Sequence, residues 1–284
     1  MFEIRVCSLV CVLTLLAAAP AWGVVTSDQA TSETDPAGPM GINWDYVYPY
    51  KGSSAVAVSP YFLLTAHHVA DDAPSWSTTI SGTVYTELEV IYHSPADDPD
   101  PTHTTAADLA LVRLDKALPG HYDIYSGAFS TSSPPRALEL VMIGFGYAGT
   151  VAPDGESYDQ DSGTARIKRW GTNTVSSETE ITGLGYTYEG MIMDFSDGAT
   201  TYEAGAVTHD SGGGVFVQDP ADGVWKLAGT TTVVYGPSGA RTATGAVEVG
   251  EYQQWITATV PEPASLAVLG FGGLAGLWRR RRAG

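Results

Sequence analysis

The stretch His209-Asp210-Ser211-Gly212-Gly213-Gly214-Val215-Phe216 places a serine on a glycine-rich turn that leads into an apolar strand. Two earlier segments carry side chains that complement this serine. One apolar run ends at the pair His67-His68, and a single acid, Asp108, stands at the start of another run that we expect to be buried. Nucleophilic acyl transfer needs these three residue types, because a histidine must take the proton of the serine hydroxyl and a buried carboxylate must hold the imidazole in the right tautomer.

The glycines and the order of the three residues favour the same chemistry. Glycines keep the turn open, so that backbone N–H groups point at the oxyanion that develops during acyl transfer. The order His, Asp, Ser differs from that of subtilisin and of the α/β-hydrolases. The segments resemble the trypsin/chymotrypsin-like serine peptidases, whose signatures are Thr-Ala-Ala-His, Asp-Ile-Ala-Leu and Gly-Asp-Ser-Gly-Gly. The resemblance covers about residues 41–258, since Gly144-Phe145-Gly146 and residues 249–256 are similar to the Gly-Trp-Gly strand end and the closing helix of that family.

This resemblance implies a role for each residue of the triad. His68 would be the general base, Asp108 its orienting carboxylate and Ser211 the nucleophile, and the alternative base His67 stays open because the register decides which ring faces the cleft. The oxyanion donors would be the backbone N–H groups of Ser211 and His209. The family has glycine at the second of these positions. If that position needs a glycine-like conformation, His209 would turn its N–H away and weaken catalysis by about 2–4 kcal/mol.

Short runs of β-branched and aromatic residues, separated by turn residues, predict an all-β barrel or sandwich. The resemblance implies the barrel form, with two six-stranded antiparallel β-barrels and a short C-terminal helix over residues 249–257. No internal repeat and no linker divides residues 41–259. We therefore expect one chymotrypsin-like serine peptidase domain there.

The specificity pocket is predicted at Gly205 and Thr232. Members of the family that cleave after Arg or Lys carry an aspartate six residues before the nucleophile, and Gly205 occupies that position. A cationic side chain would find no buried counter-charge. Thr232 lies in a strand that lacks the usual Ser-Trp-Gly, and we expect a small or apolar side chain before the scissile bond.

Both ends of the chain carry sorting features. Residues 1–23 combine an early Arg5, an apolar run and a small-residue cleavage pattern, which indicate a secretory signal peptide. Residues 260–284 place Pro-Glu-Pro before an apolar stretch and an arginine cluster. This order resembles the PEP-CTERM sorting signal of Gram-negative bacteria, which implies processing by an exosortase-type enzyme; an ordinary membrane tail anchor is the alternative. Residues 24–40 are polar and aperiodic, which predicts a flexible N-terminal leader.

The mature N-terminus has two candidate positions. In the family, the acid next to the nucleophile, here Asp210, receives the new N-terminus after activation. Cleavage after Gly23 would expose Val24-Val25 for that role, whereas cleavage after Ala21 fits the signal pattern equally well.

Composition argues against several function classes. The chain of 284 residues has a formal net charge of -18, and residues 24–259 alone contain 9 Lys and Arg against 30 Asp and Glu, which gives -21. Such acidity argues against nucleic acid as a partner, because phosphate binding rests on Lys and Arg. Both cysteines, Cys7 and Cys11, lie in the signal segment, so we expect neither disulfides nor a thiolate metal site.

The sequence predicts no metal and no cofactor. Two acidic clusters, residues 71–72 and 97–100, would offer oxygen ligands to calcium, but they lack EF-hand spacing and solvated loop charge is the favoured interpretation. His93, His103 and His121 show no metal-ligand spacing, and we expect them at the surface.

Two functions from different classes remain. The first is a secreted serine endopeptidase that acts on protein or peptide substrates. It would cross the inner membrane, contact it transiently through the C-terminal helix, and stay extracellular or at the cell surface or matrix after C-terminal processing. The second is a catalytically weak or inactive peptidase-fold protein that acts in surface or matrix adhesion, which His209 and the sorting signal suggest. The intact triad of His68, Asp108 and Ser211 favours the first.

Overall fold

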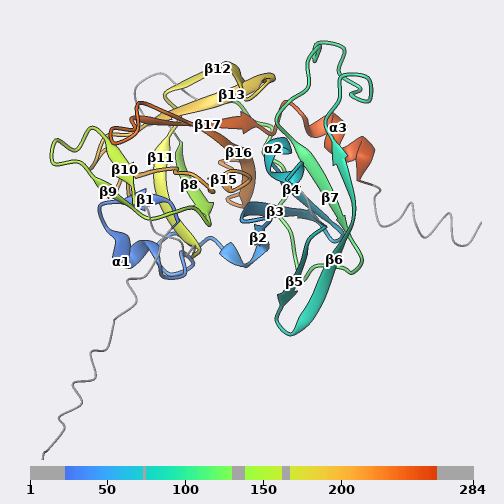
Figure 1. The fold of residues 1–284 in the computed structure, drawn as a ribbon, viewed down its shortest axis with the longest axis horizontal. Coiled ribbons are helices and arrows are strands. Elements are labelled where there is room, and N and C mark those ends of the chain that lie inside the picture. Colours follow the sequence, from blue (N-terminus) through green and yellow to red (C-terminus); the bar gives the residue numbers. More distant parts are fainter. Residues whose placement is uncertain (1–22, 73–74, 130–137, 162–166, 261–284) are drawn as a thin grey trace, which may run out of the picture.

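The computed structural model describes residues 23–72, 75–129, 138–161 and 167–260. Within these ranges most of the secondary structure is β, arranged as two large antiparallel sheets that share a hydrophobic core (Figure 1). The predicted signal peptide, apart from its last residue, and the predicted C-terminal helix with its arginine cluster lie outside the described residues.

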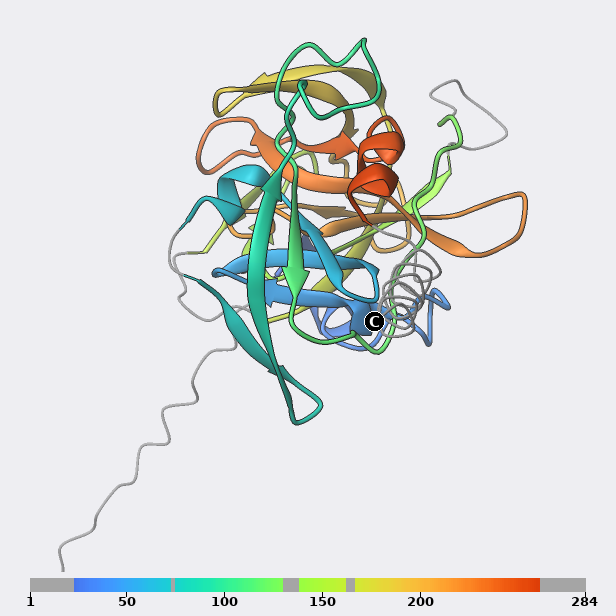
Figure 2. The ribbon, with the colours of Figure 1, turned by 90° about the vertical axis from the view of Figure 1, so that its right-hand side faces the viewer.

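The first sheet has six strands in the order β2-β3-β4-β7-β6-β5, with antiparallel neighbours throughout. The strands are β2 (Val47–Tyr50), β3 (Ser53–Ser59), β4 (Phe62–Thr65), β5 (Ser77–Ile80), β6 (Thr83–Tyr92) and β7 (Ala110–Leu114). The hairpin of β5 and β6 projects from the body of the domain (Figure 2).

The second sheet has seven strands in the order β11-β8-β15-β16-β17-β13-β12. The strands are β8 (Glu139–Gly144), β11 (Arg169–Thr174), β12 (Ser177–Gly183), β13 (Tyr186–Asp194), β15 (Gly214–Gln218), β16 (Trp225–Tyr235) and β17 (Ala243–Glu248). Edge strand β12 begins with polar residues that are mostly exposed, so no apolar alternation marks it in the sequence. The predicted all-β, chymotrypsin-like architecture is confirmed, with seven strands rather than six in the second sheet.

Among the described residues, two small sheets and three short helices complete the domain. The small sheets pair β1 (Val25–Thr26) with β14 (Ala204–Gly205) and β9 (Gly149–Val151) with β10 (Tyr158–Gln160). The helices are α1 (Gln29–Ser32), α2 (His67–Ala70) and α3 (Gln253–Thr259), and a 3-10 turn spans Trp44–Tyr46. Helix α3 begins later than predicted because the N–H of Val249 still donates to the carbonyl of Ala228 at 3.0 Å, which prolongs the pairing of β17 with β16.

The strands of the first sheet are apolar on both faces, and each face belongs to a different core. Leu64 of β4 and Leu111 of β7 are register partners that face the core shared with the second sheet. Their neighbours Leu63 and Val112 are also partners and face a separate cluster within the first half of the domain. Because strand side chains alternate between faces, nearly continuous apolar runs result.

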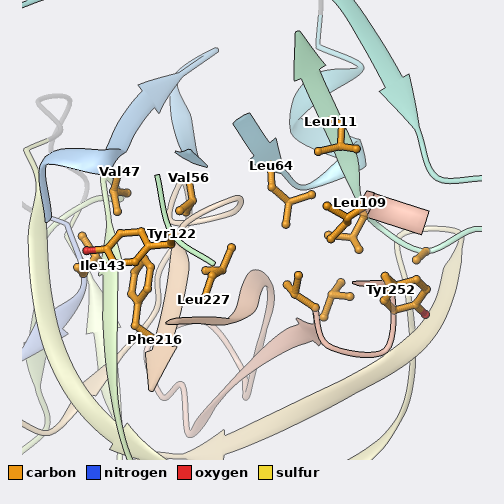
Figure 3. Packing of buried hydrophobic residues seen from close by; sticks show 14 of the residues in the cluster. Val47, Val56, Leu64, Leu109, Leu111, Tyr122, Ile143, Phe216, Leu227 and Tyr252 are labelled. Carbon is orange, nitrogen blue, oxygen red and sulfur yellow. The ribbon is translucent and has the colours of Figure 1, made fainter. Parts of the chain in front are cut away.

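The shared core joins the two sheets across their junction (Figure 3). Tyr122, in the connection between the halves, packs on Phe216 of β15 with ring centroids 4.5 Å apart. At the other end of the core, Leu109 lies near Tyr252, which precedes α3 (Figure 3). Burial of this apolar surface fixes the relative position of the sheets, and therefore of any site built from both.

The prediction of a flexible leader over residues 24–40 is wrong. Val25 is fully buried and β1 pairs with β14. Glu33 forms an ion pair with the buried guanidinium of Arg169 at 2.5 Å. The polar composition of this segment was misleading, because the segment is held by backbone pairing with β14 and by an ion pair to β11 of the second sheet, and neither leaves an apolar periodicity.

Candidate active site

The nucleophile candidate Ser211 lies in a tight turn between β14 and β15. The N–H of Gly213 donates to the carbonyl of Asp210 at 2.8 Å and closes this turn. Gly212 has a φ of +79°, and a Cβ there would lie 2.0 Å from the carbonyl oxygen of Ser54. Because Ser54 belongs to β3 and its N–H donates to the Ser211 carbonyl at 3.0 Å, the turn is held at the junction of the two sheets.

His68 reaches the same junction from the first sheet. It is the second residue of α2, which follows β4 directly. Its ring Nδ1 lies 2.7 Å from Oδ2 of Asp108, and its backbone N–H donates to Oδ1 of the same carboxylate at 3.0 Å. The Asp108 side chain is only 1% exposed. With Nδ1–H facing an acceptor, the neutral ring has Nε2 as its acceptor atom, which is the tautomer that a general base requires.

His68 and Ser211 line one open cavity of about 420 Å³. No hydrogen bond joins their side chains within the described residues, and without a bound substrate such bonds are often long or poorly aligned. The structure therefore places a serine and a histidine that is paired with a buried carboxylate in one cavity.

The alternative base, His67, occupies a different environment. Its ring stacks on Tyr92 and Tyr186, with centroid distances of 4.1 Å and 4.8 Å. Burial lowers its pKa, which favours the neutral ring. His67 is not among the residues that line the cavity, whereas His68 is, so the geometry favours His68 as the base.

His209 adopts the conformation that a glycine would have at its position. Its φ is +77°, in the left-handed region that side chains other than glycine rarely enter. The ring is held in place by Tyr147, whose hydroxyl lies 3.1 Å from Nε2 and whose ring packs edge-on at 4.6 Å. The expected difficulty, in which histidine would avoid the glycine-like conformation, is therefore not observed.

Asp210 is buried behind the turn that carries Ser211, in a nest of backbone donors. Its carboxylate accepts hydrogen bonds from the N–H groups of Gly146 at 2.7 Å and Val207 at 2.9 Å, and from that of Val24. Burial raises its pKa to about 7, although these donors and the nearby Arg169 lower it in part. The N-terminal segment thus reaches the residue next to the candidate nucleophile Ser211.

Residues 34–256 match the family model described as Trypsin. The chain belongs to the trypsin family. Residues 259–282 match the PEP-CTERM protein-sorting motif, which indicates export and targeting to the cell surface or exterior.

Several solved structures of low sequence identity are similar to this trypsin-family chain over part of its length. The passenger domain of plasmid encoded toxin, an autotransporter enterotoxin of enteroaggregative Escherichia coli, is 16% identical with a TM-score of 0.49, over 72% of this chain and 21% of the toxin chain. Mouse neuropsin, a serine protease, is 17% identical with a TM-score of 0.47, over 73% of this chain and 88% of its own. HL collagenase is 18% identical with a TM-score of 0.47, over 72% and 85%. No curated protein matches the chain in sequence.

The structure separates the two predicted pocket residues of this trypsin-family domain. Thr232 lines the cavity together with neighbouring residues of β16. Its hydroxyl, however, is paired with the hydroxyl of Tyr188 at 2.8 Å. Gly205 is buried in β14 and is not among the lining residues. The position that sets charge preference in Arg- and Lys-cleaving members is therefore not part of the lining of this cavity.

Sequence reasoning missed several residues of the cavity lining, and Leu184 is the most exposed apolar residue among those it missed. Leu184 lines the cavity from the tip of the β12–β13 hairpin, with a φ of +55° and 64% of its surface exposed. The flanking Gly183 and Gly185 are a turn signal. They indicate a hairpin, but nothing local places that hairpin beside a serine far along the chain.

The prediction that His93 lies at the surface is wrong. Its ring is buried, with Nε2 2.7 Å from Oδ2 of Asp98, and that same oxygen lies 2.8 Å from Nδ1 of the mostly buried His103. His121 is exposed, as predicted.

This cluster of two histidines and an aspartate has the geometry of hydrogen bonds rather than of metal ligands. Nδ1 of His93 accepts the N–H of Ala107 at 2.9 Å, so its Nε2 carries the proton in the neutral ring and donates to Asp98. Ligands each about 2.0–2.1 Å from a tetrahedral zinc would be roughly 3.3 Å apart, farther than the observed 2.7 Å. The cluster packs on Tyr252 and thereby ties the loop before Asp108 to the start of α3.

Proposed function

We propose that this chain is an exported serine endopeptidase that hydrolyses peptide bonds through an acyl-enzyme on Ser211. The observation that supports it most is the buried Asp108 carboxylate bonded to His68 within the cavity that Ser211 also lines. The trypsin-family membership supports the same reaction class.

Four residues carry out this reaction: His68, Asp108, His209 and Ser211. Ser211 Oγ attacks the scissile carbonyl while Nε2 of His68 takes its proton, and the Asp108 carboxylate stabilises the resulting imidazolium. The backbone N–H groups of Ser211 and His209 stabilise the oxyanion. His68 then gives the proton to the leaving amine, and water activated by the same ring hydrolyses the acyl-enzyme.

The test is covalent labelling of residues 24–259 with a fluorophosphonate, which reacts only with an activated serine. The expected result is stoichiometric labelling that Ser211→Ala abolishes. The control is Ser77→Ala, which removes an exposed hydroxyl from the projecting hairpin and should leave labelling intact. A cooperatively folded wild-type domain that takes up no label would contradict the proposal.

A second candidate is a catalytically weak or inactive protein that acts in surface or matrix adhesion. The sorting motif at residues 259–282 favours it, because that motif indicates the location where adhesion proteins act. The positive φ of His209 supports activity instead, because the residue adopts the glycine-like conformation after all. Binding to exopolysaccharide or cells that Ser211→Ala leaves undiminished, without cleavage of casein, would favour adhesion.

Export and processing complete the proposal. The signal peptide would be removed after Gly23, since the N–H of Val24 already lies at the Asp210 carboxylate, where a free amine would meet a buried acid. The C-terminal motif would contact the inner membrane transiently until an exosortase-type enzyme removes it. Among the described residues, none of the helices has the length and apolar character of a membrane span. Mass spectrometry of both termini tests this, and a first residue of Trp22 would contradict cleavage after Gly23.

A further inference from the structure

The space beside Gly205 is occupied by an aromatic ring from elsewhere in the chain. A Cβ built on Gly205 would lie 2.2 Å from Cζ of Tyr158 and 2.5 Å from its hydroxyl oxygen. A side chain at position 205 would therefore project directly into this ring. In this chain Tyr158 fills the volume that the side chain six residues before the nucleophile would otherwise take.

Tyr158 is held there on every side. It is fully buried in β10, and its backbone exchanges hydrogen bonds of 3.0 Å and 2.8 Å with Arg241. Its hydroxyl donates to the carbonyl of Ala206 at 2.8 Å. Its ring packs on Phe195 at a centroid distance of 4.8 Å. The ring is thus a fixed wall rather than a movable flap.

Val207 connects this wall to the cavity. It lines the cavity beside Ser211, and it also belongs to the small apolar cluster that contains Tyr158. Neither Tyr158 nor Gly205 lines the cavity itself. Tyr158 therefore lies outside the cavity lining and is linked to it through Val207.

None of the described residues that line the cavity carries a carboxylate. Its side chains are threonines, valines, one leucine and two histidines besides the serine. Such a lining has no counter-charge for a cation, and the space beside Gly205 is already taken by the Tyr158 ring.

We propose that Tyr158 closes the substrate cavity from behind, so that it accepts a small uncharged side chain, that of glycine, alanine or serine, next to the scissile bond. This assignment rests on the proposed endopeptidase function and makes Tyr158 a specificity-determining residue. One additional methylene changes kcat/KM by roughly 10–200-fold in a tight apolar pocket, so a full leucine or phenylalanine side chain should be strongly disfavoured.

The test compares hydrolysis of two peptide p-nitroanilides that differ only in the last residue, alanine or leucine. The wild-type domain should prefer alanine by at least about tenfold in kcat/KM. Tyr158→Phe keeps the ring and should keep the preference. Tyr158→Ala empties the space and should shift the ratio at least about tenfold towards leucine, with Tyr158→Leu as a smaller opening if the alanine variant does not fold.

Fluorophosphonate labelling of each variant separates the two ways in which the test can fail. A labelled wild type that prefers leucine would overturn the assignment of Tyr158 and leave the endopeptidase proposal standing. The same holds for folded, labelled Tyr158→Ala or Tyr158→Leu variants with an unchanged ratio. A folded wild type that neither takes up label nor hydrolyses either substrate would overturn both.

Discussion

Replacing Asp108 by asparagine should leave the fold intact and disable the base. The asparagine side chain has the same shape, and its carbonyl can still accept the backbone N–H of His68, which lies 3.0 Å from Oδ1. Its NH₂ group would then face the ring nitrogen that now lies 2.7 Å from Oδ2. Because that group only donates, His68 would carry its proton on Nε2 and could not accept one from Ser211.

The expected decrease in the labelling rate of Asp108→Asn follows from the loss of two interactions. Stabilisation of the imidazolium by a charged hydrogen bond is worth about 1.5–3 kcal/mol. To restore the productive tautomer, the amide must turn over, and its NH₂ then opposes the backbone N–H of His68 at a cost of about 1–3 kcal/mol. Together these losses correspond to labelling that is about 10²- to 10⁴-fold slower, since each 1.36 kcal/mol is tenfold in rate.

The assay is the second-order rate of fluorophosphonate labelling, measured with the melting temperature of the same preparation. Asp98→Asn is a matched control, because Asp98 is also 1% exposed and also lies 2.7 Å from a histidine nitrogen, but away from the cavity. Asp98→Asn should lower the melting temperature, but the labelling rate of the folded variant should fall by no more than about threefold. A cooperatively folded Asp108→Asn variant that labels within about threefold of the wild type would refute the role of Asp108.

Three further perturbations test other parts of the structure. Gly212→Ala should abolish labelling and destabilise the fold, because its Cβ would meet a carbonyl oxygen at 2.0 Å. Gly82 is the control, with a similar φ of +82° and open space around it, and Gly82→Ala should lower the free energy of unfolding in urea by only about 1–2 kcal/mol. His209→Gly should label within about threefold of the wild-type rate, since glycine adopts this φ without strain; a hundredfold loss would instead assign the ring a catalytic task. Burial and three nearby glutamates raise the pKa of Glu248 from 4.5 to about 7, so this carboxyl lowers the stability of the fold as pH rises through that interval. Glu248→Gln should therefore raise the melting temperature at pH 8 and leave it unchanged below the unfolded pKa of 4.5. Glu180→Gln, an exposed control, should leave the melting temperature unchanged at both pH values.

The strands and the candidate catalytic residues were predictable from the sequence where a short segment of the chain carries the signal. Turn glycines, apolar runs and the order of His68, Asp108 and Ser211 are written in short segments, and they led to the family and the β architecture. The β12 strand escaped because its exposed polar start carries no apolar alternation. The leader was misjudged because the partner of Glu33, the buried Arg169, is distant in sequence.

The sequence by itself determined the residue types of the candidate triad, the sorting motif and the all-β fold, because each depends on residues close together in the chain. Only the tertiary structure decided that His68 rather than His67 meets Asp108, that His209 takes the glycine-like conformation, and that Tyr158 fills the space beside Gly205. These three outcomes depend on how side chains pack across the junction and between distant loops. Packing of that kind is a sum of many long-range contacts, and no single segment contains it.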